Sequence, residues 1–407
     1  MRVALVSSGL RAAPPPLHGA VEQQIAWQAQ GLAELGVSVD VVTVGEPRDL
    51  DGGAQGGPRY HRLGPAAPEG APSGAGALLA EARFAGRARA LLARLAPDVV
   101  HWHARYACLL ALRGRAERWR SVYHAHNWKG AERMGYPAWS ARRQAARAGA
   151  LAEAHIARRV DHVVAVSEFV KRAVLRDARL PEERVSVVTN ALDLARFSPA
   201  PGGAPSGEEV LFVGRLAAEK GLLVLLAAMA QVARARPRAA LTVVGPSAGG
   251  TERGAYARRC RRLVEELGLG PRVSFAGPIP NADVPALVRG CRVLVVPSVW
   301  GEPCGVVVLE GLACGAVLVA ARAGGIPELL EDGVTGLLAP PGDPAALAAA
   351  LARALSDEAL RRSCAEHGPR RAAERHAPAA IAARLLAHYE RLLGSRLAPA
   401  GSGGDRP

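Results

Sequence analysis

The sequence predicts an α/β protein made of two doubly wound parallel-sheet domains, and three observations support this. The chain has 407 residues, more than one hydrophobic core usually serves and suited to two domains of ordinary size. Short β-branched runs alternate with Ala- and Leu-rich helical stretches, a pattern typical of parallel strands buried on both faces. A stretch rich in Gly and Pro at residues 198–209 interrupts this alternation, so we expect the interdomain linker there.

The first domain is predicted over residues 1–197. It starts with a strand, because "MRVALVSSGL" has only a short apolar stretch and no cleavage-type segment after it. A signal peptide is therefore not predicted, and we expect a cytoplasmic protein. The segment from about residue 46 to 76 is rich in Gly and Pro and is predicted to be a loop. The predicted strands lie in "RVALVSS", "VSVDVVTVG", "PDVVHWHA", "SVYHAHN", "DHVVAVS" and "VSVVTN".

The second domain is predicted over residues 210–370, where the alternation restarts. A C-terminal helix is predicted over 371–395, and the tail 396–407 is expected to be disordered. Neither domain has a GxGxxG after its first strand, which counts against an ordinary NAD-binding domain. The predicted strands lie in "VLFVGRL", "AALTVVG", "RVSFAGPI", "CRVLVVPS" and "AVLVAAR", and the predicted helices cover 221–236, 255–267, 283–289 and the segment around Glu310.

The composition suits a soluble protein with reduced thiols. Hydrophobic residues make up 49% of the chain, and the longest apolar run, near 306–319, is broken by Glu310, Gly311 and Gly315, so no membrane span is predicted. The six cysteines lie far apart without CxxC spacing, which favours core packing over a disulfide framework or a zinc site.

The formal net charge of +14 favours anionic partners. Aromatic residues make up only 4% of the chain and do not interleave with the arginines, so nucleic acid is not an expected partner. Phosphorylated small molecules suit this charge, and so does peripheral contact with an anionic membrane at its inner face. The simpler alternative is that many arginines lie on solvated helix faces.

Ligands of open α/β sheets bind beyond the carboxyl ends of the strands, so residues just after each predicted strand are candidate site residues. His18 and Gly19 precede a helix whose N-terminal amides could face a phosphate or a sugar. After "VLFV", Gly214 and Arg215 begin a loop that reaches Lys220 and enters a helix. The two cations could hold a diphosphate, the Arg with its forked guanidinium and the Lys as a point charge. The simpler alternative is a turn with two solvated charges.

A third candidate is "EPCGVVVLE", which sets Glu302 and Glu310 eight positions apart around an apolar run. If a helix begins around Gly305, Glu302 lies in the loop before it and Glu310 projects from its second turn. The small Gly305 would let a phosphate approach the amides of Gly305 and Val306. The loop carboxylate could bind sugar hydroxyls, and the helical one could bind the two hydroxyls of a ribose. A surface salt bridge for Glu310 is an awkward alternative, because its apolar neighbours leave no polar face.

Two histidine pairs also follow strands, His101 and His103 in "HWHARY", and His124 and His126 in "HAHNW". Residues i and i+2 of a strand share a face, so either pair could chelate a metal. No Asp, Glu or Cys accompanies them at metal-ligand spacing, so no metal site is predicted. A His just beyond a strand is expected to donate a hydrogen bond to substrate or to orient a reacting group. The "DLD" at 49–51 is formally a D-x-D, but it lies in the Gly- and Pro-rich segment and is interpreted as a solvated turn.

Several motifs occur together in this sequence. The most specific is E-x7-E, from Glu302 to Glu310, followed by a strand and by "GGIPELL" at 324–330. The others are "GRL…KG", "VSEFVK" at 166–171, "NALD…F" from Asn190, and "HGA" before the first helix. Together they resemble the retaining glycosyltransferases of family four, which have the GT-B fold, and the resemblance covers nearly the whole chain.

The sequence departs from the family pattern at two positions. Ala191 stands where the family's N-G-V-D has its Gly, and Ala20 replaces the second residue of a Gly-Gly pair, so only Gly19 matches. His126 fits the family's active-site His, since it precedes Asn at the end of a strand, and His124 is the alternative by register.

The resemblance implies two Rossmann-like domains that face each other across a cleft, with the C-terminal helix returning to the N-terminal domain. It also implies a nucleotide-sugar co-substrate, most commonly a UDP-sugar, no other cofactor, and a hydroxyl- or amine-bearing acceptor bound by the N-terminal domain. The anomeric configuration would be retained, with the acceptor attacking on the face that the diphosphate leaves, since no residue stands out as a covalent nucleophile.

The resemblance also assigns roles to the candidate residues. Glu310 would hold the ribose and Glu302 would contact hydroxyls of the transferred sugar. Arg215 and Lys220 would neutralise the leaving diphosphate, assisted by helix amides, which makes a divalent metal dispensable. The predicted catalytic residues are His126, Glu302, Arg215 and Lys220; the donor-binding residues are Glu310, Gly305, Val306, Gly214 and Gly19; and the candidates for acceptor or sugar contact are His18, His124, His103 and Asn190.

Two other classes of function remain as alternatives. A nucleotide-sugar epimerase on the same fold would need a further acid/base set, and a phosphorylase would release a sugar phosphate when given inorganic phosphate. A catalytically silent sugar-nucleotide binder is disfavoured because the candidate catalytic residues are present. Candidate acceptors are a glycan, a lipid-linked saccharide and a small-molecule natural product.

Overall fold

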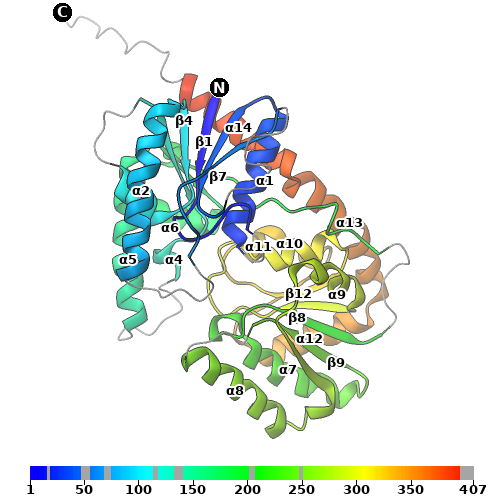
Figure 1. Ribbon diagram of the computed structural model, residues 1–407. Helices are drawn as coiled ribbons and strands as arrows, with labels where there is room; N and C mark the ends of the chain where they lie inside the picture. Colours follow the sequence, from blue (N-terminus) through cyan, green and yellow to red (C-terminus); the bar gives the residue numbers. More distant parts are fainter. Residues whose placement is uncertain are drawn as a thin grey trace, which may run out of the picture.

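The chain forms two α/β domains, each built around a parallel sheet, as a computed structural model shows (Figure 1). The doubly wound, two-domain fold that the sequence predicts is confirmed. The structure describes residues 1–15, 19–46, 56–67, 75–112, 118–132, 141–200, 207–246 and 251–394.

The N-terminal sheet has seven strands in the order β3-β2-β1-β4-β5-β6-β7, and every neighbouring pair is parallel. Alternate residues of a strand point to opposite faces, so both faces of this sheet are apolar. In β1, Val3 and Leu5 pack with the helices α1 and α14, whereas Ala4 and Val6 pack with helices on the other face. The strands are β1 (Arg2–Val6), β2 (Ser38–Thr43), β3 (Arg59–Arg62), β4 (Val99–Trp102), β5 (Arg120–Ala125), β6 (His162–Ala165) and β7 (Val185–Val187).

The helices of this domain cover both faces of the sheet. Residues of α2, α3, α5 and α6 join the apolar cluster on the face opposite α1 and α14. The helices are α1 (Ala20–Glu34), α2 (Ala75–Leu95), α3 (Arg105–Ala111), α4 (Lys129–Glu132), α5 (Ala141–Arg159), α6 (Glu168–Ala178) and α14 (Pro378–Gly394).

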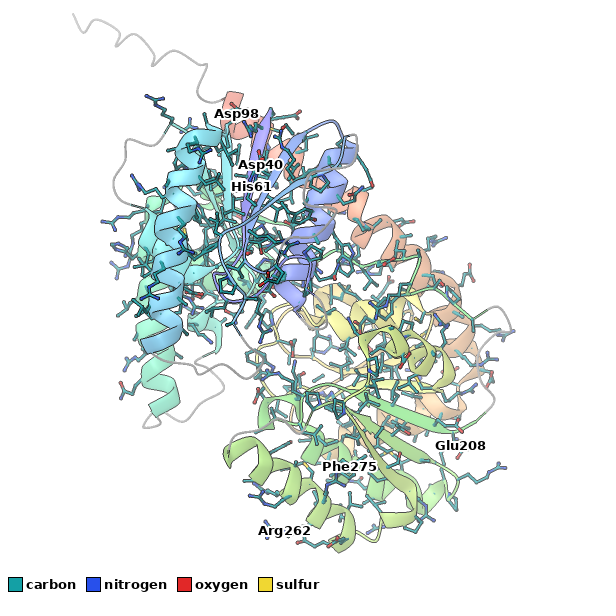
Figure 2. All side chains as sticks on the ribbon, in the orientation of Figure 1. Asp40, His61, Asp98, Glu208, Arg262 and Phe275 are labelled. Atoms are coloured by element: carbon teal, nitrogen blue, oxygen red, sulfur yellow. The ribbon has the colours of Figure 1, made fainter. Side chains whose placement is uncertain are left out.

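Strand β3 lies within the segment 46–76, which the sequence predicts to be a loop, so that prediction is wrong for Arg59–Arg62. The strand "RYHR" carries no apolar alternation; the buried Asp40 of the neighbouring strand holds it instead. Arg59 Nε lies 3.2 Å from Asp40 Oδ1 and His61 Nε2 lies 2.8 Å from the same atom, and Asp40 and His61 lie together in Figure 2. Burial opposes ionisation of Asp40, but the bonds from His61 and Arg2 outweigh it and hold the pKa of this carboxyl well below its usual range.

The C-terminal sheet has six parallel strands in the order β10-β9-β8-β11-β12-β13. Val293 and Val295 of β11 pack with α7 and α12, and Leu294 packs on the other face with α9, α10 and α13. The strands are β8 (Glu209–Val213), β9 (Ala240–Val244), β10 (Val273–Gly277), β11 (Val293–Val296), β12 (Val317–Ala321) and β13 (Leu337–Ala339). The helices are α7 (Leu222–Ala235), α8 (Thr251–Glu266), α9 (Val284–Gly290), α10 (Val306–Ala313), α11 (Ile326–Leu329), α12 (Pro344–Ser356) and α13 (Glu358–His376).

The last helix, α14, returns to the N-terminal domain and packs beside α1, as expected (Figure 1). The predicted range 371–395 is wrong at its start, because residues 371–376 end α13 and α14 begins at Pro378. Tyr389 of α14 is fully buried, and its hydroxyl lies 2.6 Å from His101 Nδ1 in the N-terminal sheet. The predicted linker, 198–209, falls between β7 and β8 except for its last residue, Glu209, which begins β8. Its residues 201–206 and the predicted tail 396–407 lie outside the described residues. The domain limits at residues 197, 210 and 370 stay a prediction.

All six cysteines are buried and none is in a disulfide, in agreement with the prediction from their spacing. Among the described residues, no helix combines the length and the apolar character that crossing a membrane requires.

The order of the strands indicates where in the molecule a ligand site is expected. In each sheet the winding direction reverses next to the first strand, between β1 and β4 and between β8 and β11. At such a point the loops after the two strands diverge and leave a crevice at their carboxyl ends. The functional site is therefore expected where the two crevices meet.

Candidate functional site

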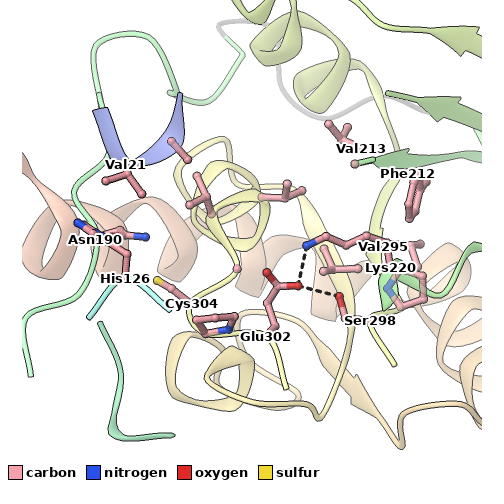
Figure 3. Close-up of a pocket in the computed structure, with 18 of the residues that line it drawn as sticks. Val21, His126, Asn190, Phe212, Val213, Lys220, Val295, Ser298, Glu302 and Cys304 are labelled. Carbon is pink, nitrogen blue, oxygen red and sulfur yellow. Dashed lines mark hydrogen bonds and ion pairs between the residues drawn. The ribbon is translucent and has the colours of Figure 1, made fainter. Parts of the chain in front are cut away.

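A cavity of about 280 Å³ lies at this junction and is lined by both domains (Figure 3). The C-terminal domain contributes the ends of β8 and β11 and the start of α10. The N-terminal domain contributes the start of α1 and the segments after β5 and β7. The lining residues are 212–214, Lys220, 295–298 and 302–307 from the first group, and Ala20, Val21, Gln24, His126 and Asn190 from the second.

Lys220 and Glu302 form an ion pair at the cavity wall, with Lys220 Nζ 2.7 Å from Glu302 Oε2. Ser298 Oγ donates to the same oxygen at 3.2 Å, and Trp300 Nε1 donates to it at 3.0 Å. The ammonium also lies over the Trp300 ring, 5.7 Å from its centroid. Glu302 is 8% exposed, and three donors compensate its burial.

All three donors contact Oε2, and among the described residues no hydrogen bond reaches Glu302 Oε1. A carboxylate oxygen has two lone pairs, so Oε1 keeps its full capacity to accept from a ligand. An ammonium has three N–H groups, so Lys220 retains donors beyond the one that faces Glu302. The two side chains therefore hold each other in place, and both keep hydrogen-bonding capacity for a ligand.

Gly221 brings Lys220 to this position. Its φ is +74°, a left-handed conformation, and a Cβ there would lie 1.8 Å from Pro297 O, so only Gly allows this approach. Val299 N donates to Glu219 O at 3.0 Å and joins the two loops. Leu222, fully buried, then starts α7.

Gly214 lines the cavity, but the side chain of the next residue, Arg215, does not. Arg215 is 45% exposed and its Nη2 lies 3.2 Å from Glu219 Oε1. Of the two cations that the sequence places after β8, the structure brings only Lys220 into the cavity wall.

The helix α10 begins at the cavity, as the sequence predicts. Gly305 precedes it with φ +73°, and Val306 and Val307 of its first turn line the cavity. Their amides belong to the part of a helix whose N–H groups have no partner within it, which favours anions there. Glu310 lies on the second turn, half-buried and outside the lining. Burial raises the pKa of Glu310 to about 7, and the charge of Arg196 opposes this rise.

The structure merges the two histidine pairs into one cluster at the ends of β4 and β5. His103 Nδ1 lies 2.9 Å from His126 Nε2, and the His124 and His126 rings stack with centroids 4.1 Å apart. His126 lines the cavity, while His101, His103 and His124 are buried behind it. Burial lowers the pKa of His126 to about 3, so its imidazole is neutral. Burial and the neighbouring imidazoles also hold the pKa values of the other three well below the usual range.

His101, His103 and His124 are the described residues whose ligand atoms come close enough to consider a metal ion, all within 4.8 Å of one another. Their rings lie face to face, with planes 11° to 33° apart, instead of pointing at one centre. Among the described residues no carboxylate joins this group. The arrangement favours a stack of neutral rings, and the absence of a metal stays a prediction.

Of the remaining predicted residues, Asn190 lines the cavity and Gly19 directly precedes α1, outside the lining. His18 and the "DLD" at 49–51 lie outside the described residues. Ala191, which replaces a Gly of the family pattern, is buried and is not among the residues with a positive φ. The side chain of Gln24 bonds to its N–H at 2.7 Å and to its C=O at 2.8 Å. These two bonds hold the turn without a Gly.

Three residues of the site were missed by sequence reasoning, namely Gln24, Ser298 and Trp300. Ser298 and Trp300 follow β11 directly, so the rule that polar residues after a strand are site candidates could have found them. Gln24 carried no such signal, because its partner, Ala191, is 167 residues away.

Two protein-family models match the chain. The model described as "Glycosyltransferase Family 4" matches residues 21–196, and the one described as "Glycosyl transferases group 1" matches residues 197–371. Relatives include the D-inositol 3-phosphate glycosyltransferase of Salinispora tropica, 31% identical over 84% of this chain and 76% of the relative. The protein of the same name from Acidothermus cellulolyticus is 31% identical over 83% of this chain and 78% of the relative.

Solved structures share the fold across nearly the whole chain. Sucrose-phosphate synthase from Thermosynechococcus elongatus has a TM-score of 0.79 and 26% identity, with 97% of this chain and 99% of that chain covered. HepE of Anabaena in complex with UDP-glucose has a TM-score of 0.70 and 21% identity, with 97% of this chain and 100% of that chain covered.

Proposed function

Since this chain belongs to glycosyltransferase family 4 and has the GT-B fold, we propose that it moves a sugar from a UDP-sugar to a hydroxyl- or amine-bearing acceptor, with retention and without a metal. The observation that carries this proposal is the ion pair of Lys220 and Glu302 at the wall of the interdomain cavity. It sets a cation and a carboxylate with an open oxygen beside the first turn of α10.

In this proposal Lys220 stabilises the leaving diphosphate. One N–H of its ammonium faces Glu302, and the others can donate to phosphate oxygens. Val306 and Val307 at the start of α10 line the same cavity, and their amides belong to the positive end of the helix dipole. Charge that develops on the leaving group thus meets fixed donors, which supports a reaction without a divalent cation.

Arg215 is the second proposed cation. It directly follows Gly214, which lines the cavity, and its present partner is the half-buried Glu219. Exposed ion pairs of this kind are weak, so the guanidinium can exchange Glu219 for a diphosphate at little cost.

Glu302 and Glu310 are proposed to bind the donor through their oxygens. Oε1 of Glu302 is available for a sugar hydroxyl, and Glu310, one turn beyond the lining residue Val306, is available for a ribose. Glu302 is the one carboxylate among the described lining residues, and its bonds to Lys220, Ser298 and Trp300 reduce its nucleophilicity. This favours attack by the acceptor on the face that the diphosphate leaves over a covalent intermediate on Glu302.

His126 is proposed to act from the acceptor side. It lines the cavity from the N-terminal domain, opposite the groups that would hold the donor. Its neutral imidazole can form a hydrogen bond with a sugar hydroxyl without adding a charge, and His103 orients it from behind.

The donor and acceptor classes are tested by a panel. UDP is proposed because structural neighbours are solved with UDP or UDP-glucose, and D-inositol 3-phosphate joins the acceptor panel because relatives carry its name. Purified protein is given UDP-, GDP-, ADP- and dTDP-sugars, each with and without acceptors and EDTA. We expect EDTA-resistant nucleotide release from one donor, faster with the right acceptor, and a retained anomeric configuration by NMR.

Other outcomes of this panel would support the alternatives. Sugar phosphate formed from added inorganic phosphate indicates a phosphorylase, and interconversion of the donor sugar indicates an epimerase. Nucleotide binding without any turnover indicates a silent binder.

A cytoplasmic location with peripheral membrane contact is also proposed. On α2, Leu78 and Leu79 are about half exposed, and Arg83 and Arg87 follow on the exposed surface of the same helix. Flotation with anionic vesicles at low salt tests this contact, with neutral vesicles as the control. Failure to bind the anionic vesicles would remove it.

A further inference from the structure

At the junction of the domains, Glu328 of α11 accepts two backbone hydrogen bonds from α6 of the opposite domain (Figure 1). The amide nitrogen of Glu168 lies 2.7 Å from Glu328 Oε2, and that of Phe169 lies 2.8 Å from Oε1. The side chain of Ser167 accepts from Val170 N at 3.2 Å. The first N–H groups of a helix have no partner within it. In α6, the N–H of Val170 is therefore bonded to the cap residue Ser167, and the N–H groups of Glu168 and Phe169 are bonded to Glu328 of the other domain.

Glycines on the Glu328 side let the domains approach this closely. A Cβ on Gly301 would lie 2.5 Å from a ring carbon of Phe169, and a Cβ on Gly325 would lie 3.0 Å from Ser167 Cβ. Both distances are shorter than ordinary carbon contacts of about 3.5–4.0 Å. The start of α6 thus packs against glycines of the opposite domain that carry no side chain.

The segment that carries Glu328 is also bonded to the backbone of Glu302. Gly325 N donates to Glu302 O at 2.7 Å. Gly324 has φ +61°, and a Cβ there would lie 2.2 Å from Glu302 O, so this turn fits the backbone of Glu302 closely. Since only two residues separate Gly325 from Glu328, a movement of Glu328 acts directly on the loop that holds Glu302.

We propose that Glu328 is a positioning residue that locks the two domains together and thereby holds Glu302 in the arrangement that turnover needs. Its effect on turnover rests on the proposed function, whereas the lock itself does not. Without the carboxylate, the amides of Glu168 and Phe169 would stay unpaired at the junction unless the domains separate and admit water. Unpaired amides are costly, so separation becomes more favourable.

Hydrogen exchange tests the lock directly. In the wild-type protein we expect the amides of Glu168 and Phe169 to exchange slowly, although the first amides of a helix usually exchange fast. In Glu328→Ala their protection should fall about tenfold or more, while the amide of Val174, later in α6, keeps its protection. The radius of gyration from X-ray scattering should rise. Fast exchange of the two amides in the wild type, or unchanged exchange and scattering in the variant, would overturn the lock.

Kinetics test the coupling to Glu302. Glu328→Ala should lower kcat about tenfold, while the Kd for UDP stays within about twofold. The groups proposed above to hold UDP lie in the C-terminal domain, and Gly19 of the N-terminal domain is outside the cavity lining. Glu328→Gln keeps one accepting oxygen, so we expect kcat and amide protection between those of Glu328→Ala and the wild type. If Glu328→Ala does not fold, Glu328→Gln is used for the test instead. Glu331→Ala is the control, since that side chain is 60% exposed. Loss of amide protection with an unchanged kcat would overturn the coupling to Glu302. A wild-type protein that turns over no donor would contradict the proposed function. In that case the hydrogen-exchange experiment would still test the lock.

Discussion

Lys220 Nζ and Glu302 Oε2 lie 2.7 Å apart although the two residues are 82 positions apart in the sequence. Each residue belongs to a motif that is ambiguous alone, a basic turn after β8 and a carboxylate before α10. Their contact joins the two motifs into one unit. In this unit the cation and the carboxylate orient each other.

Because they act as a unit, we expect substitutions of the pair to be non-additive. Lys220→Ala and Glu302→Gln should each lower kcat about 100-fold, and the double variant should lose little more than the worse single one. Steady-state kinetics with the best donor measure this. Arg353→Ala, which removes a surface cation, is the control and should keep full activity. Losses that multiply in the double variant would show that the two residues act independently.

The hydrogen bonds that Trp300 and Ser298 donate to Glu302 should contribute less to kcat than the pair of Lys220 and Glu302. Trp300→Phe keeps the ring near Lys220 and removes only the N–H that donates to Glu302, so we expect kcat to fall about fivefold, as for one lost hydrogen bond of about 1 kcal/mol. Ser298→Ala should behave similarly. Kinetics at several donor concentrations separate kcat from KM. Wild-type kcat in both variants would mean that Lys220 alone orients the carboxylate.

Gly221 should tolerate no side chain. In Gly221→Ala the methyl group would meet Pro297 O in a backbone with φ +74°, so we expect a loss of more than about 2 kcal/mol in the free energy of unfolding. Thermal or urea unfolding measures it. Gly268→Ala is a matched control, since φ is +65° there and no atom lies within 4 Å of the added carbon. It should cost only about 1 kcal/mol. Equal losses would show that backbone strain, not the close contact, dominates.

A buried carboxyl on α2 should make stability fall between weakly acidic and neutral pH. Glu81 is 5% exposed, and burial raises its pKa to about 7, against the opposing charge of Arg105. Between its usual pKa and 7 the folded state holds a proton that the unfolded state has lost, so stability decreases as pH rises through this window, by about 3 kcal/mol in total. The free energy of unfolding of Glu81→Gln minus that of the wild type should therefore be larger at pH 8 than at pH 5.

Unfolding measured at both pH values tests this. Glu183→Gln, at an exposed position, serves as the control and should leave the pH dependence unchanged. A Glu81→Gln variant whose difference from wild type is the same at both pH values would contradict the raised pKa.

Local sequence reasoning failed where a residue depends on a distant partner. The strand β3 has no apolar alternation, and its arginines and histidine are held by Asp40, about 20 residues earlier in the chain. The sequence suggests two separate histidine pairs, but β4 and β5 are neighbours, so the histidines at the ends of both strands stack into one cluster.

The sequence by itself determined the two parallel sheets, the position of every strand except β3 and β13, and the candidate residues after the strands. These follow from the chain's own periodicity, because strands buried on both faces must be apolar throughout and ligands bind at their carboxyl ends. Only the tertiary structure decided that Lys220 meets Glu302 while Arg215 stays on the surface, and that Glu328 reaches the start of α6. Such contacts join residues far apart in the chain, and they depend on close approach of backbones at Gly221, Gly301 and Gly325, which no local pattern of residues specifies.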